Sequence, residues 1–138
     1  MPVVAAIVCF SAAVCSPESV IVIDGDTIVV QGEHIRILGI NAPELSKAKC
    51  RDETVRGLRA RSRLMDLMQD GNVVVERGEG RDRFDRYRRT LAHVSVDGVD
   101  VGETLMREGL ARRWVQRYVK MEEPWCQSNV DAALKAWN

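Results

Sequence analysis

The sequence predicts a mainly β domain in which five short strands form a barrel and about three helices close it. Runs of β-branched residues bounded by turn signals predict the strands, and stretches with apolar residues three and four apart predict the helices. A chain of 138 residues makes one domain with a sizeable core. Its composition, 46% hydrophobic and 29% charged, is that of an ordinary globular protein.

Three strands open the predicted barrel. Two β-branched runs, 19–24 and 26–31, are separated by Asp24-Gly25, a dipeptide typical of hairpin turns. A second turn signal follows, and residues 34–40 form the predicted third strand. The proline three residues beyond this run ends the pairing, because proline cannot donate a hydrogen bond to a neighbouring strand.

A long helix and two more strands follow. Residues 52–69 predict an amphipathic helix, because small and apolar residues recur in it at helical spacing. The fourth strand is predicted at 73–76 and the fifth at 89–96, with an arginine-rich loop between them. A short helix at 101–108 and a last one from about 128 to 137 complete the chain. This order of elements matches a five-stranded barrel of the oligonucleotide-binding (OB) type.

The charge of the chain is balanced, but its positive side chains are mostly arginine. The formal net charge is zero, so the whole molecule does not attract nucleic acid by charge alone. Sixteen of the twenty basic residues are arginine, the side chain that binds phosphate with two parallel hydrogen bonds. Five of them lie within nine residues: Arg81, Arg83, Arg86, Arg88 and Arg89. This run indicates either a phosphate-binding surface or a solvated loop in which Asp82 and Asp85 are interspersed. Both interpretations stand.

Arg36 lies between Ile35 and Ile37 in the predicted third strand. Burial of a guanidinium group costs several kcal/mol unless an anion or another acceptor meets it. Alternation along the strand places Arg36 on the face opposite its isoleucine neighbours. The sequence therefore predicts an acceptor close to this side chain.

The first fifteen residues are predicted to be a signal peptide or hydrophobic leader, followed by the domain at 19–138. They contain no charged side chain and include Ser11-Ala12-Ala13, which is typical of a signal cleavage site. The apolar run is too short to cross a membrane as a helix. We expect a secreted or periplasmic protein. The alternative is a cytoplasmic protein in which part of this run forms the first buried strand.

Two cysteines, Cys50 and Cys126, lie far apart in the predicted domain. In an oxidising compartment they predict one disulfide that ties the C-terminal segment to the loop before the long helix. In a cytosolic protein, two free buried thiols are expected instead. No CxxC pair or histidine cluster in the sequence indicates a zinc site.

Four segments together resemble the staphylococcal nuclease-like (thermonuclease) domain: DGDTI at 24–28, IRILGINAPE at 35–44, DRYRRTLAHV at 85–94 and DVGETLMREGLA at 100–111. The similarity runs over residues 20–114, about two thirds of the chain. Each segment alone is a weak signal, but their order, spacing and agreement with the predicted strands make the joint match specific. The resemblance implies an OB-fold barrel and a metal-dependent enzyme that cleaves nucleic acid.

The resemblance also implies a Ca²⁺ site. Asp26 matches the first metal-binding carboxylate of the family, and Ala42 would contribute its backbone carbonyl. Asn41 stands where the family commonly has a second aspartate. An amide oxygen can still bind Ca²⁺, but the missing negative charge predicts weaker affinity. Without the resemblance, Asp26 would be interpreted as a carboxylate at a turn.

Catalytic and substrate-binding side chains are implied in the same way. Glu44 matches the glutamate that positions or deprotonates the attacking water, and Arg36 and Arg89 match the arginines that hold the scissile phosphate. Tyr87 matches an aromatic residue that helps to hold a terminal phosphate. Arg88 replaces a glycine that is often found in the family. It strains the chain if the position needs a positive φ, and otherwise adds a phosphate contact.

These features predict a nuclease that hydrolyses phosphodiester bonds of DNA or RNA. A barrel face with few side chains able to read base edges favours single-stranded or frayed substrates. The alternative is a non-catalytic OB-fold module that binds an oligonucleotide or a protein and has a weakened metal site. Nucleic acid is the expected partner. The sequence indicates no obligate protein partner and no transmembrane span, and a monomer is expected.

Overall fold

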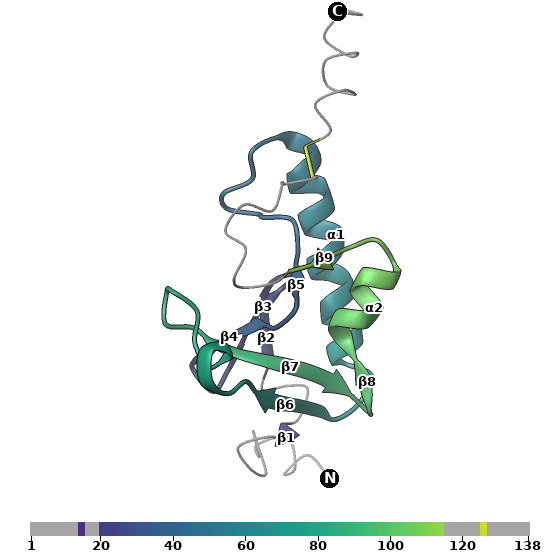
Figure 1. Cartoon of the computed structure of the whole chain (residues 1–138). Helices are drawn as coiled ribbons and strands as arrows, with labels where there is room; N and C mark the ends of the chain where they lie inside the picture. The colour runs from purple at the N-terminus through teal and green to yellow at the C-terminus, as the bar shows by residue number, and fades with distance from the viewer. Residues whose placement is uncertain (1–13, 16–19, 115–124, 127–138) are drawn as a thin grey trace, which may run out of the picture.

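The computed structural model describes residues 14–15, 20–114 and 125–126, which form a curled β-sheet packed against two helices (Figure 1). The predicted last helix, at 128–137, and residues 1–13 of the predicted leader lie outside these ranges. Within the described ranges, neither helix combines the length and the apolar character that a membrane crossing requires.

The main sheet has the strand order β1-β6-β7-β4-β3-β2, and β8 pairs with β7. The strands β4 and β7 pair in parallel, and the other pairs are antiparallel. The five longest strands therefore follow the order of an OB-fold, as the sequence predicts. The strands are β1 (Val14–Cys15), β2 (Val20–Asp24), β3 (Thr27–Val30), β4 (Glu33–Ile37), β6 (Val73–Arg77), β7 (Thr90–Val96) and β8 (Val99–Asp100).

The prediction of one continuous third strand over 34–40 is wrong. The strand β4 ends at Ile37, and Gly39 has a φ of 81°, which turns the chain out of the sheet. Ile40–Asn41 then forms a separate strand, β5, which pairs with β9 (Arg112–Arg113). The apolar alternation continues through the glycine, so the local pattern does not reveal the break.

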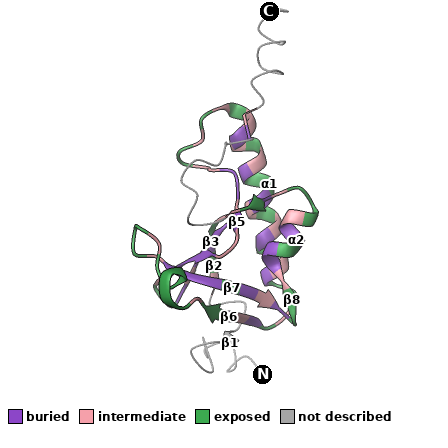
Figure 2. Cartoon of the chain, viewed as in Figure 1, coloured by how far each residue is buried: buried purple, intermediate pink, exposed green. Residues whose placement is uncertain are grey.

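The helix α1 spans Arg51–Met68 and buries the small and apolar residues whose spacing predicts it. Cys50 caps its N-terminus. The helix α2 spans Val101–Arg107 and is capped by Asp100. The buried faces of both helices and the inner face of the sheet form one core, which appears in Figure 2 as the purple segments.

Small residues allow the first hairpin turn to approach α1 closely. A Cβ atom added to Gly25 would lie only 2.7 Å from the Cβ atoms of Ala42 and Ala60. The turn between β2 and β3, the segment after β5 and the middle of α1 are therefore locked together. We expect any larger side chain at position 25 to disturb the residues on either side of this turn.

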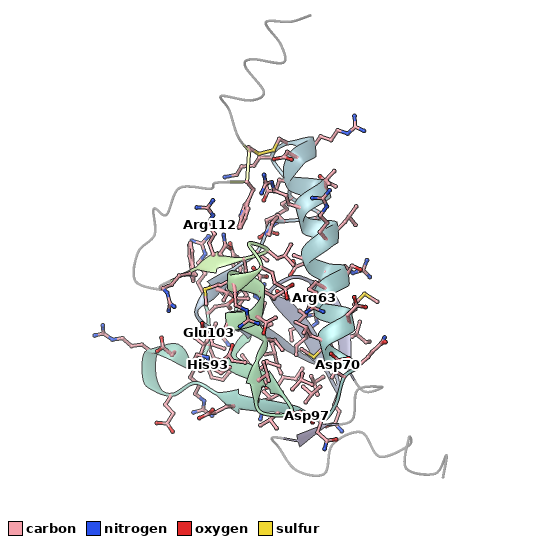
Figure 3. All side chains as sticks on the ribbon, turned by 90° about the vertical axis from the view of Figure 1, so that its right-hand side faces the viewer. Arg63, Asp70, His93, Asp97, Glu103 and Arg112 are labelled. Atoms are coloured by element: carbon pink, nitrogen blue, oxygen red, sulfur yellow. A yellow bond between two sulfur atoms is a disulfide. The ribbon has the colours of Figure 1, made fainter. Side chains whose placement is uncertain are left out.

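The last described residues are joined to the residue before α1. Cys50 and Cys126 form a disulfide, with their Cα atoms 5.9 Å apart. Next to it, the fully buried Trp125 ring packs under Arg112 (labelled in Figure 3), whose guanidinium carbon lies 5.4 Å from the ring centroid. This corner holds Trp125 and Cys126 against the N-terminal end of α1 and β9.

Candidate active site

Asp26 and Arg36 form a buried ion pair where β3 and β4 lie side by side. Their side chains are almost inaccessible, with 3% and 7% of the residue exposed. Arg36 Nη2 lies 3.3 Å from Asp26 Oδ2. Arg36 Nη1 donates hydrogen bonds to the carbonyl oxygens of Ile37, at 3.0 Å, and Ile40, at 2.8 Å. The acceptor that the sequence predicts for Arg36 is thus present, and both terminal nitrogens are engaged.

Asp26 also connects the first hairpin to the segment after β5. Its Oδ2 accepts a hydrogen bond from the backbone N–H of Ala42, at 2.8 Å, and its Oδ1 accepts one from the Thr27 hydroxyl, at 3.1 Å. Asn41 Oδ1 lies 3.4 Å from Arg36 Nη2. The three residues predicted to bind the metal, Asp26, Asn41 and Ala42, therefore lie together.

Arg89 is held beside this group by the aspartate at the start of its loop. Asp85 Oδ2 accepts a hydrogen bond from Arg89 Nε at 2.6 Å, and Asp85 Oδ1 accepts the backbone N–H groups of Tyr87 and Arg89. Arg89 Nη1 donates to the Thr27 hydroxyl at 3.4 Å. Thr27 thus contacts both Asp26 and Arg89. Through Asp26 it connects Arg89 with Arg36, the other arginine predicted to hold the phosphate.

Neither Thr27 nor Asp85 is predicted from the sequence as a site residue. Asp85 does carry a local signal, because an aspartate that starts a tight loop commonly accepts the N–H groups two residues on. The contact of Thr27 with Arg89 spans 62 positions of the sequence. No local pattern indicates such a contact.

The loop that carries Arg89 presents an aromatic ring flanked by two guanidinium groups. Tyr87 is 63% exposed. The guanidinium carbons of Arg86 and Arg89 lie 5.0 Å and 5.5 Å from its ring centroid, within the range of a cation–π contact. The ring and both positive groups are available to a ligand that combines an anion with a flat base.

Arg88, at the tip of this loop, has a φ of 64°, so the position does need the left-handed conformation. Arg88→Gly should therefore raise the free energy of unfolding by about 1 kcal/mol, because glycine adopts this conformation without the steric cost. Chemical denaturation measures the change. Arg86→Gly is the matched control, since Arg86 does not have a positive φ and should lose stability. A loss of stability in both variants would contradict the prediction.

Glu44 lies near the carboxyl group of Asp24. Burial raises the pKa of Asp24 to about 7, and the negative charges of Asp26 and, more weakly, Glu44 add to the rise. Asp24 Oδ1 accepts the backbone N–H of Asp26 at 3.1 Å. Glu44 is half-buried, and its own N–H donates to Glu53. The predicted base therefore lies near Asp24, two residues before the predicted metal ligand Asp26.

The donors in this group suit a hard cation. They are carboxylate, amide and carbonyl oxygens, which Ca²⁺ prefers, and a cation would relieve the repulsion from Asp26 that adds to the effect of burial on the pKa of Asp24. Among the described residues, no three His, Cys, Asp or Glu side chains are grouped to hold a metal by themselves. Backbone oxygens such as that of Ala42, and water, would have to complete the coordination shell.

The raised pKa of Asp24 predicts a pH-dependent stability in the presence of a chelator. The folded state, with a pKa of about 7, binds more protons than the unfolded state, with 3.8, so stability falls as the pH rises between them. The free energy of unfolding should fall by about 3 kcal/mol between about pH 5 and pH 8.

Urea denaturation of Asp24→Asn at both pH values measures this contribution, because the amide cannot ionise. The variant should lack that part of the fall, whereas Asp70→Asn, an exposed control after α1, should behave as the wild type. If the free energy of unfolding depends equally on pH in the wild type and in both variants, Asp24 is not the group responsible.

A hollow elsewhere on the surface does not belong to this group. It lies between α1, α2 and β8, and Arg63, Asp70 and Asp97 line part of it (Figure 3). It shares no residue with the segments that carry Asp26 and Arg89. The candidate site residues lie instead in the turn between β2 and β3, in β4 and the segment that follows it, and in the loop before β7.

The family model described as "Staphylococcal nuclease homologue" matches residues 34–136. The chain belongs to the staphylococcal nuclease family. The strand order, which is that of an OB-fold, agrees with this membership. Three of the four segments that carry the resemblance meet in one group of side chains, whereas the fourth, 100–111, contains α2.

Curated relatives in the staphylococcal nuclease family carry the names of nucleases. The chain is 42% identical over 94 residues to "Endonuclease YncB" and to "SPbeta prophage-derived endonuclease YokF", both of Bacillus subtilis (strain 168). It is 34% identical over 95 residues to "Thermonuclease" of Staphylococcus intermedius. These matches cover 65%, 65% and 66% of this chain. They span 44%, 31% and 55% of the relatives, respectively.

Proposed function

We propose that this protein is a metal-dependent nuclease that hydrolyses phosphodiester bonds of DNA or RNA. The observation that carries the proposal is one connected set of contacts, in which Thr27 touches both Asp26 and Arg89, and Asp26 pairs with Arg36. Glu44 lies close enough to Asp24, two residues before Asp26, for its charge to act on the Asp24 carboxyl group. The names of the relatives, two endonucleases and a thermonuclease, support the same class of reaction.

The proposed mechanism gives each side chain a separate task. Glu44 orients or deprotonates the water that attacks phosphorus. Arg89, which is about one-third exposed on its side chain, contacts the phosphate and its developing charge directly. Arg36 has both terminal nitrogens engaged, so it contributes fixed positive charge behind Asp26 and can offer only its Nε–H to the phosphate.

Ca²⁺ is the proposed cofactor, held by Asp26 and the oxygens of Asn41 and Ala42. When bound, it supplies a positive charge that polarises the phosphate and lowers the pKa of water. The chain's part is to keep these oxygens in place. The Ala42 N–H and Thr27 hydroxyl orient the two oxygens of Asp26, and the Arg36 guanidinium prevents an uncompensated buried charge.

Single-stranded or frayed nucleic acid is the proposed substrate, with Tyr87 among the side chains that bind it. Tyr87 is exposed beside Arg86 and Arg89, an arrangement that suits stacking of a base next to its phosphate. Such contacts use the flat face and the backbone rather than the base edges. Cleavage should therefore depend more on access to the strand than on its sequence.

The environment of Asn41 and its lack of negative charge favour a second candidate function. Its amide oxygen lies 3.4 Å from Arg36 Nη2, and an amide brings no negative charge to the metal. If Ca²⁺ binds too weakly for catalysis, the protein would be a non-catalytic OB-fold module that binds oligonucleotides or a protein.

One cleavage assay separates the two functions. Purified protein is incubated with single-stranded DNA and with RNA, in the presence of Ca²⁺ or of a chelator. The nuclease proposal expects degradation with Ca²⁺ alone, its loss in Glu44→Gln, and its retention in Glu76→Gln, an exposed control on β6. Binding of the oligonucleotide without cleavage in any metal would favour the module.

We also propose that the protein is exported. The apolar first fifteen residues support this, and so does the disulfide between Cys50 and Cys126, because such bonds persist in oxidising compartments. N-terminal sequencing of protein recovered outside the cytoplasm tests the proposal. Recovery of an uncleaved chain with reduced cysteines from the cytoplasm would contradict it.

A further inference from the structure

A buried carboxylate that the proposed mechanism does not use lies under the loop that carries Glu44. Glu53, in the first turn of α1, is only 1% exposed. Its Oε2 accepts the backbone N–H of Glu44 at 2.8 Å, and its Oε1 accepts the backbone N–H of Lys49 at 2.9 Å. One carboxylate therefore binds both ends of the loop 44–49.

These two hydrogen bonds are stronger than ordinary backbone hydrogen bonds, because their acceptor is a carboxylate. A hydrogen bond with one charged partner is shorter and stronger than a bond between two neutral groups. The position of Glu53 in the first turn of α1 adds the favourable field of the helix N-terminus. Its own N–H donates to Cys50 Sγ, and Cys126 Sγ lies 3.9 Å from its Oε1. The disulfide thus packs directly against the carboxylate.

The next turn of α1 supports the same loop from another side. A Cβ atom added to Gly57 would lie 2.8 Å from Leu45 Cδ2 and 3.1 Å from the carbonyl oxygens of Pro43 and Glu44. The backbone of this loop therefore rests on the helix surface, and Glu53 fixes its N–H groups there. On the other side, the Ala42 N–H is bound to Asp26. The segment 42–44 is thus held to Asp26 through Ala42 and to the helix through Glu44.

We propose that Glu53 is a positioning residue that sets the placement of the general base Glu44. This inference rests on the proposed function, because it assigns Glu53 a role only if Glu44 manages the attacking water. A misplacement of a catalytic group by about 1 Å can cost about 10²-fold in rate. Loss of the Glu53 hydrogen bonds should therefore act on the chemical step. Binding of the phosphate by Arg89 should change little, since Arg89 is held independently by Asp85 and Thr27.

The test compares kcat and KM of three variants on single-stranded DNA with Ca²⁺, at a temperature at which circular dichroism shows each to be folded. Glu53→Ala should lower kcat by about 10²-fold with little change in KM. Glu53→Gln should lower it less, because its amide has one oxygen and can still accept one of the two N–H groups. Asp52→Asn, the neighbouring residue on the same helix turn, should match the wild type. If Glu53→Ala does not fold, the isosteric Glu53→Gln carries the comparison.

A double variant shows whether Glu53 acts through Glu44. Glu44→Gln and Glu44→Gln/Glu53→Gln should have the same residual kcat. Once the base has been removed, the loss of the residue that positions it has no further effect on the rate. Two outcomes would overturn the inference: a kcat of Glu53→Gln equal to that of the wild type, or effects of the two substitutions that multiply. Both are distinct from failure of the proposed function, which would show as a wild-type protein that does not cleave or a Glu44→Gln variant that does.

Discussion

Arg89→Ala should lower kcat for cleavage of single-stranded DNA by about 10³-fold, while the fold stays intact. Removal of one donor aimed at the charge that develops in a transition state typically costs about 10²–10³-fold in rate. Arg89 also brings a full positive charge, and its guanidinium is half-buried and fixed by Asp85 and Thr27. Single-turnover cleavage with Ca²⁺ measures the effect, and denaturation shows that the variant is folded.

Two further variants show whether the geometry of the guanidinium matters or only its charge. Arg89→Lys keeps the charge but cannot contact Asp85 and Thr27 from one planar group, so we expect it to remain impaired. Arg59→Ala removes an exposed arginine on α1 and should cleave as the wild type. A loss of less than about tenfold for Arg89→Ala would contradict the proposed contact with the phosphate.

Arg36→Met should lower the free energy of unfolding by about 3–5 kcal/mol. Removal of one partner from a buried ion pair leaves the other charge without compensation, and this is strongly destabilising. Here Asp26 would stay 3% exposed with its negative charge, and the carbonyl oxygens of Ile37 and Ile40 would each lose a donor. Urea denaturation in the presence of a chelator measures the loss. Nuclease activity should fall as well, because Asp26 is the proposed metal ligand.

The matched control is Arg113→Met on β9. The guanidinium of Arg113 lies 3.9 Å from Glu103, and both side chains are largely exposed, so the pair contributes about 0–1 kcal/mol. The double variant Asp26→Asn/Arg36→Met should regain part of the stability lost in Arg36→Met, because no buried charge remains. Equal effects of Arg36→Met and Arg113→Met would show that the buried pair does not stabilise the fold.

The sequence predicts the strands and helices well where each is a local pattern. The β-branched runs, the Asp24-Gly25 turn and the helical spacing of α1 all lie within short windows, and the structure confirms them. The strand β5 escapes prediction because its partner is β9, more than seventy positions away along the chain. Only the three-dimensional fold brings such a pair together.

In the candidate site too, some contacts are predictable from local chemistry and others depend on the fold. Chemistry alone predicts that Arg36 needs an acceptor, because a buried guanidinium group is costly without one, and Asp26 meets that need. Thr27, Asp85 and Glu53 act by holding other residues, and their identity as polar side chains does not reveal which groups they hold. Their contacts reach up to 62 positions away. The conformation at Arg88 depends on the loop geometry, which the sequence leaves open.

The most direct test of the account is a crystal structure of the protein with Ca²⁺ and a dinucleotide whose phosphodiester cannot be cleaved. We expect the phosphate to lie within hydrogen-bond distance of the Arg89 guanidinium and the cation to contact Asp26. We also expect the Glu44 carboxylate to face a water on the side of phosphorus away from the leaving oxygen. A dinucleotide bound on another face, or a cation that does not touch Asp26, would contradict the account.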